Sequence, residues 1–199
     1  MVPIGLNPAL ERPTLGKTIP KGEDTAMATD LDLRSSILGA WRTNCRVTEY
    51  LVEHLSADLL DSDIPSIAPR RPVRTIVGHL HNVRARWIKT LGVPHGIPAP
   101  ALVDLRRVNR RQLISALKKS GKGIEAILAL GLDSGGTVPP TPVYTWRNLP
   151  LDVGHVLMYF SSHEAHHRGQ IVTIARQLGK RLPSSVTNGV WQWSQRQRE

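Results

Sequence analysis

The chain has 199 residues, a formal net charge of +10 and one cysteine, Cys45. Its length suits one domain with a hydrophobic core, and a single cysteine excludes an intramolecular disulfide and fits a reducing cytoplasm. No window approaches the roughly 18 apolar residues that a membrane-spanning helix needs, so we expect a cytoplasmic protein without a membrane partner. The positive charge favours anionic ligands, acidic partners or nucleic acid without selecting one of them.

The N-terminal segment differs in character from the rest. Residues 1–29 are rich in proline, glycine and threonine, and their basic and acidic residues cancel. Without hydrophobic periodicity such a segment has no face to bury, so we expect a disordered leader. The excess positive charge therefore belongs to residues 30–199, which we expect to form the folded domain.

Two segments in the first half of the chain repeat apolar residues at helical spacing. Residues 31–55 are predicted to form the first helix, with Cys45 as a small core residue. Residues 56–71 contain two prolines and little pattern, and are predicted to be a loop. Pro72 suits the first turn of a second helix, which Gly92 ends.

The second helix carries two histidines, His79 and His81. Two residues apart on a helix, their side chains point about 200° apart, so at most one of them faces the interior. Both flank the apolar stripe about equally, and the pattern leaves the choice between them open. The stripe comprises Val73, Ile76, Val77, Leu80, Val83, Trp87, Ile88 and Leu91.

A proline-rich linker, residues 93–103, precedes a third predicted helix that begins at Asp104 and reaches about Leu130. This helix is strongly basic, and the simplest interpretation of its charges is a solvated face. A nucleic-acid-binding stripe is the alternative, although no helix-turn-helix, zinc-finger or RNA-binding aromatic signature accompanies it. The basic residues are Arg106, Arg107, Arg110, Arg111, Lys118, Lys119 and Lys122.

Residues 131–150 form a long connection rich in glycine and proline. Connections of this length are usually functional or cross over the fold. A long apolar segment then follows, which predicts a fourth helix over residues 151–178, with Asp152 in its first turn. Gly169 is expected to let a neighbouring helix approach this one closely.

Residues 163–170 of the fourth helix read His-Glu-Ala-His-His-Arg-Gly-Gln. His163 and His167 are four residues apart, so they share a face and can bind one metal ion. Imidazole nitrogens suit zinc, nickel, copper or iron. His166 points about 100° away from His167 and is expected either to contact the metal-binding residues without binding the metal or to lie at the surface.

The same letters match H-E-x-x-H, in which Glu164 is the general base of a zinc metalloprotease. Such an enzyme needs a third protein ligand, normally downstream. After His167 the chain has no histidine or aspartate, and its only acid is Glu199. A third ligand is therefore expected upstream, near His79 and His81, and a metalloprotease is the least favoured reading.

The string H-x-x-x-H followed at once by Arg-Gly-Gln resembles the DinB family. The resemblance extends to a Gly-His-Leu histidine at His79 with Trp87 eight residues on, and covers roughly residues 33–193. It implies an all-α fold, a DinB-like four-helix bundle with long crossover loops. It also implies three metal ligands, His79, His163 and His167.

Three neutral imidazoles leave a divalent metal one open position for water or substrate. Such a metal activates water for hydrolysis or binds a thiol as thiolate. The resemblance favours a thiol-dependent transferase slightly over a hydrolase, because the DinB-like superfamily includes such enzymes. We therefore expect zinc or nickel, a small-molecule substrate and a low-molecular-weight thiol cofactor.

The remaining roles are less constrained by the pattern. Arg168 is a candidate for binding an anionic cofactor or substrate, and pairing with an acid is equally compatible with its position. Glu164 is not a ligand in the resembling family, so a catalytic role for it rests on chemistry alone. The resemblance also implies a homodimer. The main alternative is a non-enzymatic protein of the DNA-damage response, or one associated with nucleic acid through its basic face.

Overall fold

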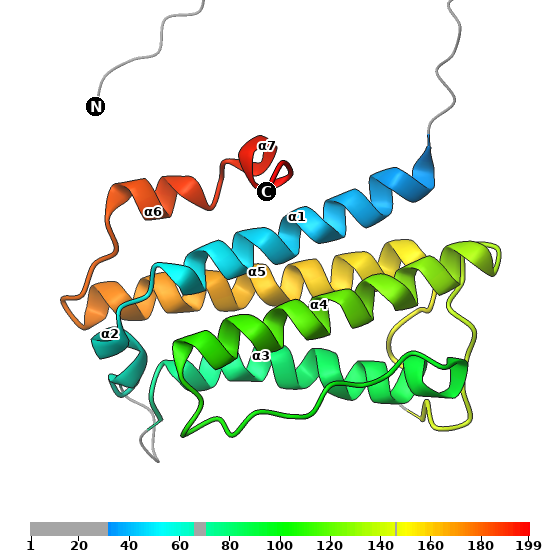
Figure 1. Ribbon diagram of the computed structural model, residues 1–199, viewed down its shortest axis with the longest axis horizontal. Coiled ribbons are helices and arrows are strands. Elements are labelled where there is room, and N and C mark those ends of the chain that lie inside the picture. Colours follow the sequence, from blue (N-terminus) through cyan, green and yellow to red (C-terminus); the bar gives the residue numbers. More distant parts are fainter. Residues whose placement is uncertain (1–31, 66–70, 146) are drawn as a thin grey trace, which may run out of the picture. The chain divides into compact units, whose positions relative to one another are not determined.

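The computed structural model describes residues 32–65, 71–145 and 147–199. Over these residues the chain is all-α, with two isolated β-bridges and no extended strand. The predicted four-helix bundle is confirmed (Figure 1). The expected leader lies outside the described residues, and the domain boundary near residue 30 stays a prediction. The long helices are α1 (Leu33–Glu53), α3 (Arg74–Trp87), α4 (Arg110–Asp133) and α5 (Val153–Gln177).

Capping side chains explain where the long helices begin. Asp152 accepts the His155 backbone N–H at 3.0 Å, so it stands just before the first turn of α5 and not within it. At α4, Asn109 and Gln112 form a reciprocal capping box, which satisfies two backbone donors at once. The predicted start at Asp104 is therefore too early. Residues 105–107 form a turn that precedes the cap.

Several short helical segments escaped the sequence pattern because each is shorter than two turns. One lies inside the predicted loop 56–71, where the Ser56 hydroxyl accepts the Leu59 N–H at 3.1 Å and starts a single turn. The second predicted helix reaches Gly92 as expected, but its last turn is π-helical and a 3₁₀ turn follows it. The short segments are α2 (Ala57–Asp61), η1 (Ile88–Gly92), η2 (Val93–His95), α6 (Ser184–Gly189) and α7 (Trp193–Arg196).

The connection between α3 and α4 is the crossover of this bundle. Helices α3 and α4 run in the same direction, so residues 96–109 return along the length of the bundle (Figure 1). The Asn82 side chain fixes this linker to α3, because its amide accepts the Val103 N–H at 2.9 Å and donates to the Val103 carbonyl at 3.1 Å. The long connection 131–150 instead joins α4 to an antiparallel neighbour, α5.

The hydrophobic core is divided into two clusters, one toward each end of the bundle. Along each long helix the clusters are separated by a short stretch with a buried polar side chain. A polar layer thus crosses the middle of the bundle. Its buried members are Asn44 and Thr48 on α1, Arg84 on α3, Ser120 on α4 and Glu164 on α5. Cys45 borders this layer and is buried, as predicted, and burial raises the pKa of its thiol.

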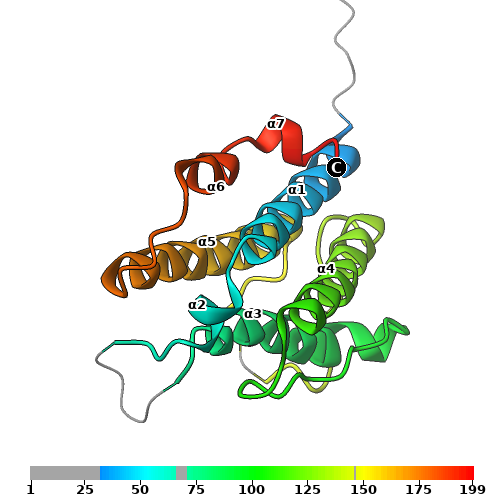
Figure 2. The same cartoon turned by 60° about the vertical axis from the view of Figure 1, so that its left-hand side comes forward.

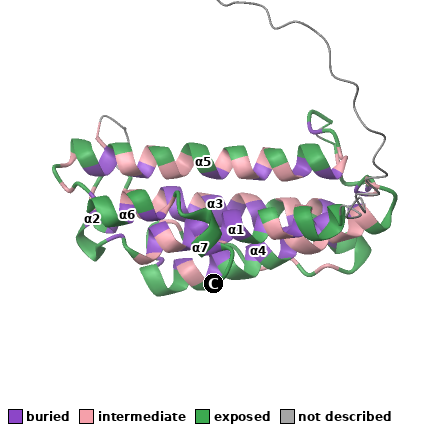
Figure 3. Ribbon diagram, turned by 90° about the horizontal axis from the view of Figure 1, so that it is seen from above, coloured by how far each residue is buried: buried purple, intermediate pink, exposed green. Residues whose placement is uncertain are grey.

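Helix α5 is the most accessible of the long helices and carries exposed residues along its whole length (Figure 3). Helices α6 and α7 lie on the α1 side of the bundle, away from α3 (Figure 1; Figure 2). Within the described ranges, no helix combines the length and apolarity required to cross a bilayer.

Candidate metal centre

Three histidines from two helices meet at the side of the bundle. His79 comes from α3, and His163 and His167 come from consecutive turns of α5. One ring nitrogen from each lies within 4.8 Å of the other two. The Nε2 atoms of His163 and His167 are 3.2 Å apart. The structure thus brings together the three residues that the sequence pattern and the family resemblance predicted.

Helical periodicity did not decide which of His79 and His81 lies beside His163 and His167. The packing of α3 places His79 there, and not His81. His81 faces the crossover linker, where its Nε2 contacts the Ala101 carbonyl at 2.9 Å and its side chain is 1% exposed. His79 faces α5, with ring centroids 5.3 Å from His163 and 5.0 Å from His167.

The geometry of the nitrogens fits a divalent metal. Gln170 presents its Oε1 2.9 Å from His167 Nδ1, so Nδ1 carries the proton and Nε2 keeps its lone pair. That lone pair faces His163 Nε2. Zinc–nitrogen bonds of roughly 2.0–2.1 Å in tetrahedral geometry place two ligand nitrogens roughly 3.3–3.4 Å apart. The observed 3.2 Å separation is close to that value.

The electrostatic environment favours the neutral form of the three imidazoles, which is the form a metal requires. Burial, and then the neighbouring His167 and His79, lower the pKa of His163 to about 4. Burial also lowers the pKa of His79, with further contributions from His167 and Arg86. For His167, burial lowers the pKa, and the hydrogen bond to Gln170 offsets part of that effect. All three shifts have the sign expected of desolvated cations.

Aromatic side chains extend from the three histidines along the bundle. Tyr159 stacks nearly parallel to His163, at 6.3 Å between ring centroids and 6° between planes. Trp87 contacts Tyr159 at 5.6 Å and Tyr144 at 5.9 Å. Trp87, Tyr144 and Arg86 line a small pocket of about 170 Å³. An aromatic wall with a cation at its edge therefore stands beside the histidine cluster.

Glu164, the predicted general base, is engaged elsewhere. Its side chain is 1% exposed, and its Oε1 accepts the Arg84 Nε–H at 2.8 Å. Its Oε2 accepts from Asn44 Nδ2 at 3.0 Å and from the Thr48 hydroxyl at 2.7 Å. Both oxygens are committed to the polar layer and have no access to a water at the histidines. This placement argues against the base role that the H-E-x-x-H reading assigned to Glu164.

Arg84 is the partner that the sequence analysis missed, although a signal for it was available. It stands four residues after Leu80 and four before Ile88, so it occupies the buried stripe of α3. Glu164 likewise follows Phe160 by four residues on the buried stripe of α5. Two opposite charges on two apolar stripes indicate a buried ion pair, because an unpaired buried charge is strongly unfavourable.

Arg168 also belongs to the polar layer and does not join the histidines. Its Nη1 donates to Asn44 Oδ1 at 3.0 Å and to the Thr48 hydroxyl at 2.8 Å. The same nitrogen lies 3.8 Å from Glu164 Oε2. Arg168 is therefore directed toward α1, whereas His167 is directed toward His79 on α3. A cofactor bound at the histidines would not meet this guanidinium.

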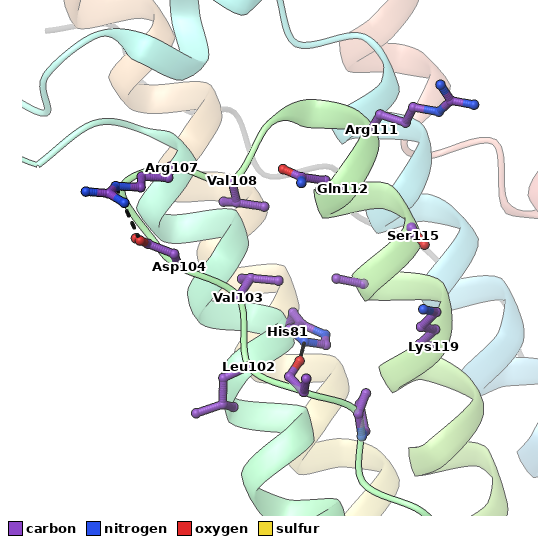
Figure 4. A pocket seen from close by; sticks show the side chains of 13 residues that line it. His81, Leu102, Val103, Asp104, Arg107, Val108, Arg111, Gln112, Ser115 and Lys119 are labelled. Carbon is purple, nitrogen blue, oxygen red and sulfur yellow. Dashed lines mark hydrogen bonds and ion pairs between the residues drawn. The ribbon is translucent and has the colours of Figure 1, made fainter.

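The basic residues predicted to lie on one face are divided between different surroundings. Arg107, Arg111 and Lys119 line a groove of about 620 Å³ between the crossover linker and α4, with His81 at its floor (Figure 4). Arg110 instead donates to the Leu55 carbonyl at 2.7 Å. Lys118 and Lys122 line another depression together with glutamates. No feature of the described surface tests nucleic-acid binding, which stays a prediction.

The helical bundle and the three clustered histidines define the class of the protein: an all-α bundle with a candidate metal centre. A model of the DinB family matches residues 137–198, a segment that contains α5 with His163, His167 and the Arg-Gly-Gln string. The resemblance to the DinB family is thus confirmed over these residues. His79 lies outside the matched segment. A comparison with curated proteins found no match.

Proposed function

We propose that the protein is a metal-dependent enzyme in which His79, His163 and His167 hold one divalent transition ion, zinc or nickel. The convergence of three imidazole nitrogens within 4.8 Å carries this proposal. Their lowered pKa values support it, since neutral imidazoles bind metal without first losing a proton. Only three protein ligands converge among the described residues, which suits a catalytic site with an open position better than a closed structural one.

When bound, such an ion supplies a Lewis acid that favours the ionised form of a coordinated thiol or water. The protein's own groups orient the ligands. Gln170 fixes the tautomer of His167, and Tyr159 stacks against the ring of His163. Trp87 and Tyr144 provide an apolar wall for a substrate, and Arg86 places a positive charge beside His79.

Thiol transfer is favoured over hydrolysis by the position of Glu164. A hydrolase of the H-E-x-x-H type uses this glutamate as a base, but here both carboxylate oxygens accept hydrogen bonds within the bundle. With a metal held by the three histidines, a coordinated thiol would ionise without such a base. Arg86 suits a thiol that carries a negative charge. The proposed activity is therefore transfer of a low-molecular-weight thiol to an electrophilic small molecule.

Metal content per chain, measured by elemental analysis on protein purified without a histidine tag, tests the proposal. We expect about one transition ion per chain in the wild type and its loss in His79→Ala and His163→Ala. His166→Ala is the matched control, because His166 is an exposed histidine of the same helix. Unchanged metal content in both variants would show that His79 and His163 do not bind the metal. Retained metal without thiol-transfer activity would restrict the proposal to metal binding.

The basic groove of Figure 4 supports a second candidate, a nucleic-acid-associated protein. Binding of a DNA duplex should then weaken steeply with salt, because counterions are released from the phosphates. Replacing Arg107, Arg111 and Lys119 by glutamine should weaken it further, while metal content stays unchanged. Arg110 is unsuitable for this test, since it holds the Leu55 carbonyl. DNA affinity that does not respond to these three substitutions would exclude the groove as the DNA-binding site.

A further inference from the structure

A second groove, of about 570 Å³, lies on the opposite side of α5 from the three histidines. Ala165 and Val172 line it and stand about 180–200° around the helix from His163. Its other walls come from α1 and from the segment that links α6 to α7, which lies beside α1 (Figure 2). The groove is therefore separate from the candidate metal centre.

The groove is apolar at its mouth. Three of the large hydrophobic side chains exposed on the described surface line it: Met158, Trp191 and Trp193. Trp191 is 80% exposed and Met158 is 61% exposed. Beside them Gly169 faces open space, since no described atom lies within 4 Å of the position of an added Cβ. The expectation that a helix approaches closely at Gly169 is therefore wrong. An exposed apolar patch of this kind indicates a binding surface.

The groove is also positively charged. Arg168 and Arg176 are its only charged lining residues within the described part of the chain. The Arg168 side chain is recessed, with 14% of its surface exposed. Its Nη1 is engaged with Asn44 and Thr48, whereas Nε and Nη2 have no hydrogen-bond partner among the described residues. A guanidinium with two free donors matches the geometry of a carboxylate.

The charge of the polar layer next to the groove does not balance. Arg84 and Glu164 form a buried pair and cancel. Arg168 contacts Glu164 only at 3.8 Å, and that carboxylate already accepts three other side chains. The three residues together keep one positive charge at the wall of an apolar groove. Because Arg168 shares the Glu164 carboxylate with Arg84, an anion that enters the groove gains more than it would at an exposed arginine.

We infer that this groove binds a small amphipathic carboxylate, with the carboxylate on Arg168 and an alkyl or aryl body against Met158, Val172 and Trp191. The groove lies within the range of small-molecule sites, about 300–1,000 Å³. Apolar walls with few polar groups are typical of such sites. This function needs no metal and goes beyond the proposed thiol transfer.

Titration calorimetry of the full chain with octanoate, and with 1-octanol as the neutral probe of equal length, tests the inference. We expect octanoate to bind about tenfold or more tightly than 1-octanol, because a charge-assisted hydrogen bond contributes on that scale. Gly169→Leu, at a position open to an added Cβ, should narrow the groove and weaken octanoate binding about tenfold or more, with metal content unchanged. Arg168→Gln should abolish the preference for octanoate.

Two controls separate this site from the metal centre. His166→Leu places the same side chain on α5 outside the groove and should leave octanoate binding unchanged. His163→Ala should remove the metal and also leave octanoate binding unchanged, so either proposal can fail without the other. Equal binding of octanoate and 1-octanol, or unchanged octanoate binding in Gly169→Leu, would overturn the inference. Self-association that Trp191→Ser abolishes and octanoate does not displace would assign the groove to a second copy of the chain instead.

Discussion

His163 and Glu164 are neighbours in the sequence, yet they serve different parts of the molecule. His163 lies with two other histidines at the side of the bundle, half-buried and with a lowered pKa. Glu164 lies in the polar layer and is bonded to Arg84. The H-E-x-x-H motif treats His163 and Glu164 as parts of one site, whereas the structure places Glu164 beside Arg84. The buried stripe of α5 decides its environment.

The lowered pKa of His163 makes the stability of the metal-free protein depend on pH. Its folded-state pKa of about 4 lies below the ordinary histidine value of 6.5, which applies to the unfolded chain. Between these values the unfolded state binds more protons, so stability is fully present above about pH 6.5 and is lost as pH falls towards 4. The lowered pKa values of His79 and His167 act in the same direction.

Urea unfolding of the chelator-treated protein at several pH values measures this effect. His163→Gln removes one titrating group and should flatten the decline. Stability that is equal in wild type and His163→Gln at every pH would show that His163 has an ordinary pKa in the folded chain.

Glu164→Gln should destabilise the bundle by about 3–5 kcal/mol, because it leaves Arg84 buried without a counter-charge. The matched control is Glu125→Gln, which breaks the more exposed pair with Arg42 and should cost less than about 1 kcal/mol. Chemical denaturation compares the two variants. Metal content should survive in both. A Glu164→Gln protein of normal stability that loses only hydrolytic activity would instead restore the base role.

At the scale of the elements, the long helices were predictable to within a few residues, except where caps intervened. Residues 31–55 and 151–178 became Leu33–Glu53 and Val153–Gln177, because the apolar period of a buried face is sustained over many turns. The start of α4 was misplaced because Asp104 also looks like a cap. The one-turn helices were missed, since so few residues establish no period.

The glycines show which contacts between elements the sequence does not reveal. At Gly131 an added Cβ would lie 2.6 Å from Val153 Cγ1 and 3.1 Å from the Val138 backbone nitrogen. Gly131→Ala should therefore destabilise the protein by about 1–3 kcal/mol through overpacking. Gly169→Ala, in open space on α5, should stabilise it by up to about 1 kcal/mol through helix propensity.

Thermal unfolding of the two alanine variants tests this pair. Their shifts should have opposite signs, although both substitutions are chemically identical and both lie in helices. Shifts of the same sign would mean that helix propensity alone decides, and that the close contact at Gly131 relaxes at little cost.

At the scale of the whole molecule, the sequence predicted the bundle and the shared face of His163 and His167, but not the pairing of helices. The i, i+4 spacing of His163 and His167 is a property of one helix. His79 joins the other two histidines only through the packing of α3 on α5, which periodicity did not determine and which the family resemblance implied. The polar layer likewise needs four helices in register, and within it Arg84 meets Glu164 where α3 and α5 come together.

Because its ligands come from two helices, a bound metal should stabilise the whole fold. A ligand that binds only the folded state adds about 2.7 kcal/mol at a free concentration a hundredfold above its dissociation constant. We expect zinc to raise the melting temperature of the wild type, and a chelator to reverse the rise. His79→Ala should not respond, although it keeps both histidines of α5. A full response of His79→Ala would place the third ligand elsewhere.

The parallel course of α3 and α4 has a consequence for how the chain folds. A simple up-and-down bundle forms from hairpins, each closed by a short local loop. Here residues 96–109 must first return along the bundle before α4 can dock. Contacts between distant parts of the chain slow folding, so this protein should fold more slowly than a hairpin-built bundle of equal length. Asn82 and His81, which hold the returning segment, then matter for the rate of assembly as well as for the finished structure.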